Sequence, residues 1–293
     1  MFKVHLSVKS IIRSKLKRVH PNVHKGNFGR VFIIAGSRGF TGASRLAAMG
    51  ALRAGAGLVT VGAPKSLTAT LTRDCLEAMW LGLPETKQGS ISRAALGKAQ
   101  LFLEKQDVLA VGPGLSRHAS TLSFIRALLL KSHKPMVVDA DAIISFCGKR
   151  KLLQKLRAPA ILTPHPGEFK NLFGIFPRTE RERVVQAKKA AKDYRIVMVL
   201  KGYRTVVADR QGRCYVNKTG NPGMATGGMG DILTGIIAAF LGQKLEPFEA
   251  ACAAVFVHGL TGDRASKIYG KVSLLPRDLL EQLPQALKAI IGS

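Results

Sequence analysis

Short apolar runs typical of buried β-strands alternate with helical stretches along most of this chain. The run VFIIAG at 31–36 leads into a loop rich in Gly, Ser and Thr and then into an Ala-rich helix. Comparable runs follow at 58–63, 108–112, 135–140 and 160–163. Alternation of this kind is typical of a mostly parallel sheet covered by helices on both faces. We therefore predict an α/β fold.

The second half of the chain continues this alternation and then becomes helical. A helix is predicted after residue 179, and the strand IVMVLKG follows at 196–202. The β-rich runs TVVAD and RCYVN flank turn residues 209–212, which predicts a hairpin. From Gly228 onward only helices are predicted. Ligands of open α/β sheets bind beyond the carboxyl ends of the strands, so we expect the loops there to converge on one crevice.

The composition is that of a folded globular protein. Apolar residues make up 46% and charged residues 22% of the 293 residues, which excludes a mainly disordered chain. No stretch approaches the roughly 20 apolar residues of a membrane-spanning helix, and no fixed-period repeat is present. We predict a basic segment at 1–23 and one domain at 24–293. The basic segment lacks a secretory signal, and it is compatible with an accessory segment, a transit peptide or a membrane-surface helix.

The chain is strongly basic. Lys and Arg number 45 against 18 Asp and Glu, a net charge of +27, and no acidic residue precedes Asp74. Such a field attracts nucleic acids, anionic lipids and nucleotides alike. Aromatic residues make up only 6%, and no RNA-recognition or zinc-finger motif is present, so nucleic-acid binding is disfavoured. The four cysteines form no C-x-x-C pair, which indicates reduced thiols in a cytoplasmic protein.

The strongest motif is NPGMATGGMGDILTGIIAAF at 221–240, where a glycine-rich loop leads directly into an apolar helix. Gly227, Gly228 and Gly230 permit a tight turn with exposed N–H groups, and the helix N-terminus adds its positive dipole end. Together they predict a site for a nucleotide phosphate. Asp231 stands in the first helical turn, where it either stabilises the helix or takes part in chemistry.

Further loops follow other predicted strands. GSRGFTG at 36–42 and Gly112-Pro113-Gly114 permit close approach of a ligand, and Ala43 begins the helix after the first of them. Neither loop has the Rossmann spacing, and the chain contains no Walker A lysine motif. His258 and Asp263 lie in a Gly-interrupted helix and are either polar groups near the site or ordinary structural residues.

Two loops carry charged or titratable side chains. LTPHPGEF at 162–169 places His165 between two prolines that stiffen the loop, and Glu168 two residues after the second proline. The pair could position a substrate amide or a metal-bound water, and Glu168 could instead cap the next helix. Lys201 ends a predicted strand and is followed by Gly202, where it either faces a phosphate or is a solvated turn charge.

Seven segments together resemble the ADP/ATP-dependent NAD(P)H-hydrate dehydratases, a family of ribokinase-like fold. In order, they are GSRGFTGA (36–43), RAGAGLVTV (53–61), VGPGLS (111–116), VVDADA (137–142), LTPHPGE (162–168), LKGYRT (200–205) and NPGMATGGMGD (221–231). The match covers roughly residues 24–285. The resemblance implies a three-layer α/β/α sandwich, and we expect a stand-alone dehydratase domain.

The reaction implied by the resemblance repairs a damaged cofactor. In NADHX and NADPHX, water has added across the nicotinamide ring, and the family removes it at the expense of ADP or ATP. ADP is the expected donor, Mg²⁺ the expected metal, and a homo-oligomer, with a tetramer favoured, the expected assembly. Phosphorylating the ring hydroxyl converts a poor leaving group into a good one. Asp231 would accept the hydroxyl proton as a general base.

The family's motifs also imply roles for individual residues. The matched hydrate-binding positions are Ala43, Gly114, His165 and Asp231. The matched nucleotide-binding positions are Lys201, Gly202, Tyr203, Arg204, Thr205 and Gly230. Glu168 corresponds to the acidic residue that helps to hold Mg²⁺, through water.

Two alternative functions share these features. A small-molecule kinase of the same fold would use the same glycine loop but release a stable phosphorylated alcohol. A nucleic-acid-binding protein that kept the fold would account for the net charge of +27, although the intact Asp231 and glycine loop disfavour it. The sequence does not choose between NADHX and NADPHX.

Overall fold

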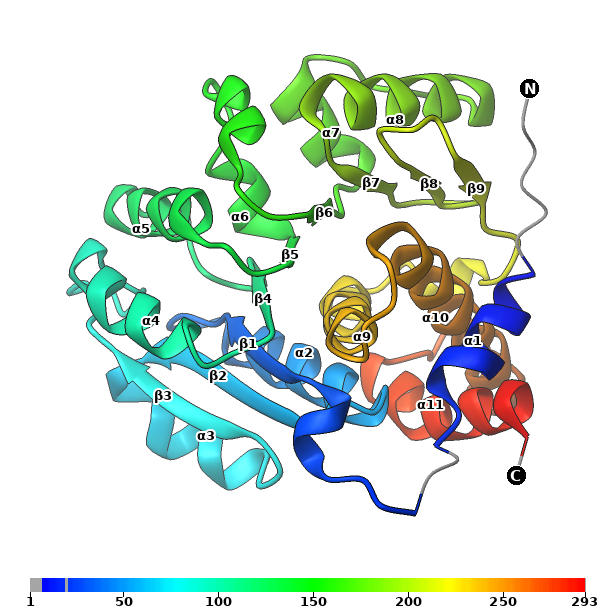
Figure 1. Ribbon diagram of the computed structural model, residues 1–293, viewed down its shortest axis with the longest axis horizontal. Coiled ribbons are helices and arrows are strands. Elements are labelled where there is room, and N and C mark those ends of the chain that lie inside the picture. The colour runs from blue at the N-terminus through cyan, green and yellow to red at the C-terminus, as the bar shows by residue number, and fades with distance from the viewer. Residues whose placement is uncertain (1–6, 19–20, 293) are drawn as a thin grey trace.

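A nine-stranded sheet forms the centre of the computed structural model, which describes residues 7–18 and 21–292 (Figure 1). The strand order is β3-β2-β1-β4-β5-β6-β7-β8-β9. Neighbours from β3 to β7 are parallel, and β8 and β9 add an antiparallel hairpin at one edge. The strands are β1 (Arg30–Ile34), β2 (Leu58–Pro64), β3 (Met79–Leu83), β4 (Val108–Val111), β5 (Met136–Val138), β6 (Ala160–Leu162), β7 (Val197–Leu200), β8 (Val206–Ala208) and β9 (Cys214–Val216).

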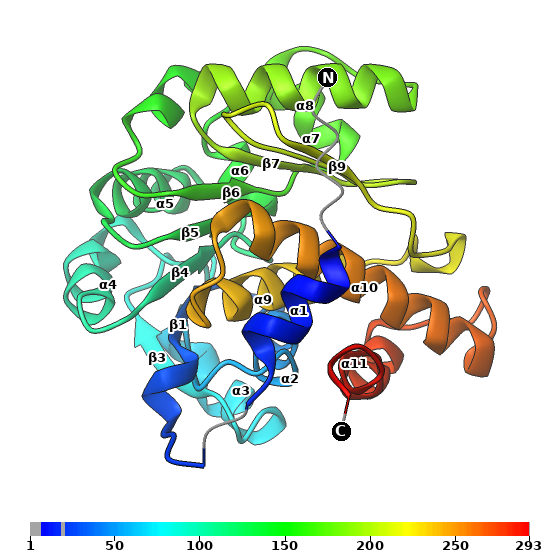
Figure 2. The ribbon, with the colours of Figure 1, turned by 45° about the vertical axis from the view of Figure 1, so that its right-hand side comes forward.

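Helices cover both faces of the sheet (Figure 2). One face carries α1 (Val8–Leu16), α2 (Thr41–Arg53), α9 (Met229–Gly242), α10 (Pro247–Tyr269) and α11 (Pro276–Ile291). The other carries α4 (Leu96–Leu103), α5 (Ala119–Lys131), α6 (Ala140–Ile144), α7 (Pro166–Phe173) and α8 (Glu180–Tyr194). The helix α3 (Thr68–Asp74) lies against β3. Short 3₁₀ helices are Lys25–Phe28, Lys65–Leu67, Arg93–Ala95, Arg150–Lys155 and Pro222–Met224.

Alternating side chains of the buried strands supply two separate cores. In β1, Val31 and Ile33 face the core under α2 and α9, whereas Phe32 and Ile34 face the core under α4 and α5. Both sets are fully buried, so the strand reads as a continuous apolar run. The predicted α/β/α sandwich with a mostly parallel sheet is confirmed, as are the hairpin and the helical C-terminal region.

Glycines allow α9 to approach α2 closely. A Cβ on Gly235 would lie 2.1 Å from the carbonyl oxygen of Ala47, and one on Gly50 would lie 2.6 Å from that of Ile232. Side chains at these two positions would force the helices apart. The contact fixes the start of α9, and with it the glycine loop, against the carboxyl ends of the strands.

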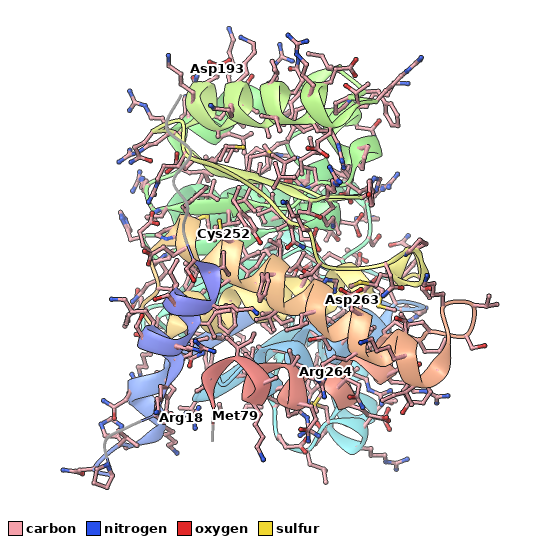
Figure 3. All side chains as sticks on the ribbon, turned by 90° about the vertical axis from the view of Figure 1, so that its right-hand side faces the viewer. Arg18, Met79, Asp193, Cys252, Asp263 and Arg264 are labelled. Atoms are coloured by element: carbon pink, nitrogen blue, oxygen red, sulfur yellow. The ribbon has the colours of Figure 1, made fainter. Side chains whose placement is uncertain are left out.

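The helix α1 packs on the C-terminal helices (Figure 3). Its buried residues are Val8, Ile12 and Leu16, one helical turn apart. The guanidinium of Arg13 donates to the carbonyl oxygen of Ile290 over 2.6 Å. Residues 8–16 therefore form part of the packed structure; the predicted segment 1–23 also includes 1–6 and 19–20, which lie outside the described residues. None of the described helices combines the length and apolarity needed to cross a membrane.

Candidate functional site

The loops after β1 and β4 meet at the carboxyl edge of the sheet. The Gly36 N–H donates to the Pro113 carbonyl over 2.8 Å, and the Ser37 hydroxyl donates to the Gly114 carbonyl over 2.7 Å. A Cβ on Gly114 would lie 2.9 Å from the Cβ of Ala43. The structure thus brings together two of the residues that the sequence assigned to hydrate binding.

A buried carboxylate, Asp139, lies directly after β5. Its Oδ1 accepts from the Lys201 ammonium over 2.8 Å and from the Thr163 hydroxyl over 2.7 Å, and its Oδ2 accepts from Thr234 over 2.8 Å. Burial alone would raise the pKa of this carboxyl. The Lys201 charge and the three hydrogen bonds outweigh burial and hold the pKa of Asp139 below its ordinary value. The residue belongs to the motif VVDADA, in which the sequence indicates no role for it.

Lys201 directly follows β7 and faces three carboxylates. Burial would lower its pKa, but the negative charges of Asp139, Glu168 and Asp231 raise it. The ammonium therefore stays charged. It also lies beside α9, because a Cβ on Gly230 would be 3.2 Å from Nζ. The structure thus places Lys201 beside Gly230, two residues that the resemblance assigns to nucleotide binding.

Asp231 occupies the first turn of α9, as predicted. Burial, followed by the charge of Asp139, raises the pKa of Asp231 to about 7; Lys201 opposes the shift, and Asp141 and Glu168 add to it. A carboxylate with this pKa changes its charge near neutral pH. That property suits a general base better than a helix cap.

His165 and Glu168 cap α7 reciprocally. The His165 Nδ1 accepts from the Gly167 and Glu168 N–H groups over 3.0 and 3.4 Å, and Glu168 Oε2 accepts from the His165 N–H over 2.9 Å. The capping role that the sequence left open for Glu168 is therefore present. The His165 Nε2 lies 3.6 Å from Glu168 Oε1, and more than half of its side chain is exposed. Burial raises the pKa of Glu168.

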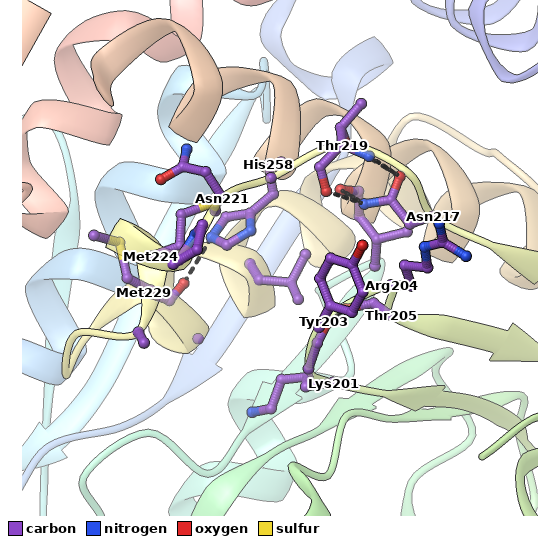
Figure 4. Close-up of a pocket in the computed structure, with 18 of the residues that line it drawn as sticks. Lys201, Tyr203, Arg204, Thr205, Asn217, Thr219, Asn221, Met224, Met229 and His258 are labelled. Atoms are coloured by element: carbon purple, nitrogen blue, oxygen red, sulfur yellow. Dashed lines mark hydrogen bonds between the residues drawn. The ribbon is translucent and has the colours of Figure 1, made fainter. Parts of the chain in front are cut away.

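A pocket of about 750 Å³ opens beside Lys201 and the start of α9 (Figure 4). Its lining includes the predicted nucleotide residues Lys201, Gly202, Tyr203, Arg204, Thr205 and Gly230, together with the segment 217–226 except Gly223. Gly227 and Gly228 precede α9 but do not line this pocket. None of the four predicted hydrate-binding residues lies among the described residues of the lining, so the two sets occupy different places.

The far wall of the pocket is fastened to α10. The Asn217 amide donates to the Val255 carbonyl over 3.0 Å, and the Thr219 hydroxyl donates to the Phe256 carbonyl over 2.9 Å. Asp263 accepts from the Gly220 N–H over 2.9 Å. Sequence reasoning left Asp263 undecided and missed Asn217. The predicted hairpin ends at Asn217, and it is the sequence feature that indicates this wall of the pocket.

His258 fixes the start of α9. Its Nε2 lies 2.9 Å from the carbonyl oxygen of Met229, and both residues border the pocket (Figure 4). Burial lowers the pKa of His258 to about 4. The imidazole is therefore neutral at pH 7, and its Nε2–H donates to that carbonyl. His258 is therefore a hydrogen-bonded polar group near the site, the first of the two alternatives that the sequence leaves open.

The loop 202–205 is braced from α8. The Arg204 guanidinium donates to Glu180 over 2.9 Å, and Arg183 donates to the Tyr203 carbonyl. The Tyr203 side chain is 79% exposed, so its ring is available to a ligand in the pocket. Figure 4 shows the ring standing at the pocket opposite His258.

Comparison with known proteins identifies similar chains. The model of a family described as NAD(P)H-hydrate dehydratase matches residues 31–285. The bifunctional NAD(P)H-hydrate repair enzyme Nnr of Moorella thermoacetica is 44% identical over 277 residues, which cover 94% of this chain and 52% of that protein. The Escherichia coli enzyme of the same name is 38% identical and is matched over 49% of its length. The chain thus spans about half the length of these relatives.

Some solved structures match this chain over nearly the whole of both chains. The ADP/ATP-dependent NAD(P)H-hydrate dehydratase of Bacillus subtilis, co-crystallised with ATP and Mg²⁺, superposes with a TM-score of 0.83 at 30% identity. The match covers 96% of this chain and 97% of that one. A hydroxyethylthiazole kinase of Pyrococcus horikoshii, 14% identical with a TM-score of 0.64, shares the fold.

Proposed function

The chain belongs to the NAD(P)H-hydrate dehydratase family, and from this premise we propose that it dehydrates NADHX and NADPHX to NADH and NADPH at the expense of ADP or ATP. The observation that carries the proposal is the position of Asp231, a carboxylate with a pKa of about 7 next to the pocket-lining Gly230. ADP is the proposed donor, with AMP and phosphate as products.

The nucleotide would occupy the pocket of about 750 Å³. Its terminal phosphates would lie against Lys201 and the first turn of α9, where the ammonium and the helix dipole stabilise negative charge. The exposed ring of Tyr203 and the loop to Thr205 would hold the rest of the nucleotide. Gly227 and Gly228 would contribute backbone N–H groups next to the pocket.

The hydrate would lie on the other side of Asp231, against Ala43, Gly114 and His165. The contact between the loops after β1 and β4 supports this placement, because it brings Ala43 and Gly114 together at the carboxyl edge of the sheet. Asp231 accepts the proton of the ring hydroxyl while the hydroxyl oxygen attacks the terminal phosphorus. Electrons from the ring nitrogen then expel phosphate to give an iminium ion, and loss of a proton from the adjacent ring carbon restores the double bond of the dihydronicotinamide.

Glu168 fits the expected Mg²⁺, because its Oε2 accepts the His165 N–H while its Oε1 accepts no hydrogen bond from the described residues. The described residues include no group of three His, Cys, Asp or Glu side chains that could form a metal cage. Mg²⁺ at phosphoryl-transfer sites is held by one or two carboxylates, by water and by the substrate's phosphates, so no such cage is needed. Glu168 is the carboxylate that would hold it, through water. When bound, the ion would neutralise phosphate charge.

Several finer expectations stay predictions: a cytoplasmic location, a homo-oligomer with a tetramer favoured, and one domain at 24–293 preceded by the basic segment 1–23. Mass photometry of the purified protein would test the assembly.

Product analysis tests the reaction. Purified protein is incubated with NADHX, Mg²⁺ and either ADP or ATP, and phosphate and phosphorylated organic products are followed by ³¹P NMR. The proposal predicts one phosphate released for each hydrate consumed. A stable phosphorylated alcohol without phosphate release would assign the protein to the small-molecule kinases instead.

A further inference from the structure

Asp139 joins four elements at the centre of the site. It follows β5 directly, and its three hydrogen-bond donors come from the residues directly after β6 (Thr163) and β7 (Lys201) and from α9 (Thr234). Asp139 is 1% exposed, and Thr163 and Thr234 are similarly inaccessible. Gly112 leaves room for this arrangement, since a Cβ there would lie 1.8 Å from the Asp139 carbonyl oxygen.

The hydrogen bonds leave Asp139 little capacity for a substrate. Both carboxylate oxygens accept bonds within the protein, and its side chain is only 2% exposed. Lys201 differs, because 19% of its side chain is exposed and it lines the pocket. Asp139 can therefore influence a bound nucleotide only through a group such as Lys201.

Lys201 has two other carboxylates close enough to affect its charge, Glu168 and Asp231. Its hydrogen bond goes to Asp139 rather than to either of them. The proposed reaction needs Asp231 free to accept a proton and Glu168 free to hold Mg²⁺. An ammonium without a fixed partner could pair with one of these groups and block it.

We propose that Asp139 is a positioning residue that holds the Lys201 ammonium at the pocket floor, against the nucleotide's phosphates and away from Asp231 and Glu168. This inference rests on the proposed function, because it assigns the pocket to a nucleotide. The hydroxyl groups of Thr163 and Thr234 hold the Asp139 carboxylate in place through one hydrogen bond to each of its oxygens. The nucleotide's phosphates would thus be recognised by a Lys201 ammonium whose position is set by the buried carboxylate of Asp139.

A double-mutant cycle on nucleotide affinity tests this without requiring turnover. Titration calorimetry with ADP and with ATP, both with Mg²⁺, is applied to wild type, Asp139→Asn, Lys201→Ala and the double variant. Each single variant is expected to raise Kd at least about tenfold, roughly 1.4 kcal/mol. The double variant should be no more than about twofold weaker than Lys201→Ala, because Asp139 acts through the lysine.

Threonine variants keep the test decisive if Asp139→Asn fails to fold. Thr234→Val should raise Kd about threefold in wild type and leave it unchanged in Lys201→Ala. The matched control is Thr121→Val, another fully buried threonine, whose hydroxyl bonds Ser90 and Ile91 in the core under α5. It should lower thermal stability without changing Kd.

Equal losses in the presence and absence of Lys201 would overturn the proposal, as would an unchanged Kd in both Asp139→Asn and Thr234→Val. A wild-type protein that binds nucleotide but forms no NADH would refute the proposed reaction alone, and the cycle would still decide the role of Asp139. A wild-type protein that binds neither nucleotide would refute both.

Discussion

The Lys201 Nζ lies 3.2 Å from the place that a Cβ on Gly230 would occupy. Because Asp139 holds the ammonium at 2.8 Å, the lysine cannot move aside without losing that bond. We expect Gly230→Ala to raise the nucleotide Kd about three- to tenfold, or roughly 0.6–1.4 kcal/mol. Titration calorimetry measures this directly. If the alanine variant bound nucleotide as tightly as wild type, the ammonium would not be fixed beside α9.

Asp231→Asn should separate binding from chemistry. The amide keeps the size of the side chain but cannot accept the hydroxyl proton, and general-base roles contribute about 10²–10⁴ in rate. We expect kcat to fall by that factor while the nucleotide Kd stays within about threefold. Single-turnover NADH formation alongside calorimetry gives both values. Turnover within a few-fold of wild type would remove Asp231 from the proton transfer.

The same substitution should stabilise the folded protein at alkaline pH. Folding raises the pKa of Asp231 to about 7, so the folded state binds its proton more tightly than the unfolded state does. The free energy of unfolding therefore falls as pH rises from about 4 to 7, relative to its value in acid. Asn carries no charge, so at pH 8 Asp231→Asn should gain about 1–3 kcal/mol in denaturant unfolding. A loss of stability would contradict the buried-charge account.

The pH dependence of the reaction follows from the same pKa. The base must be deprotonated, so kcat/KM should rise about tenfold per pH unit below 7 and level off above it. His258 has a pKa of about 4 and stays neutral over this range. Initial rates between pH 5.5 and 8.5 in buffers of constant ionic strength test this. A profile that is flat across neutral pH would show that another group carries the proton.

The contact between α2 and α9 predicts a strong difference between two helical glycines. A Cβ on Gly235 would meet the Ala47 carbonyl at 2.1 Å, whereas one on Gly97 in α4 meets nothing within 4 Å. We expect Gly235→Ala to lower the free energy of unfolding by about 2 kcal/mol or more through overpacking. Gly97→Ala should be neutral or stabilising by up to about 1 kcal/mol. Urea unfolding of both variants measures this difference. Similar changes in the free energy of unfolding would mean that α2 and α9 can separate without an energetic cost.

Much of the fold is predictable because local patterns there agree with tertiary burial. The run at 31–36 is apolar on both faces and forms the buried strand β1, and the Gly-rich start of α9 is evident from the amino-acid order alone. The strand β3 was not predicted. It is a partly exposed edge strand, and its sequence MWLGL lacks both alternation and β-branched residues.

The site is predictable where each of its residues stands in a recognisable local motif. Lys201 and Gly230 belong to separate motifs that were both assigned to the nucleotide, and they do meet. Asp139 and Asn217 were missed because their roles arise from partners distant in sequence, such as Thr234 and Val255. No local spacing records such contacts, and only the packed structure reveals that Asp139 is the centre of the charged cluster.

Absorbance at 340 nm tests the central claim most directly. Wild-type protein and Asp231→Asn are mixed with NADHX and Mg²⁺, with ADP, with ATP or without nucleotide. A nucleotide-dependent rise with wild type, at least about 10²-fold slower with the variant, is predicted. No rise with either nucleotide, from protein shown by circular dichroism to be folded, would contradict the proposed function.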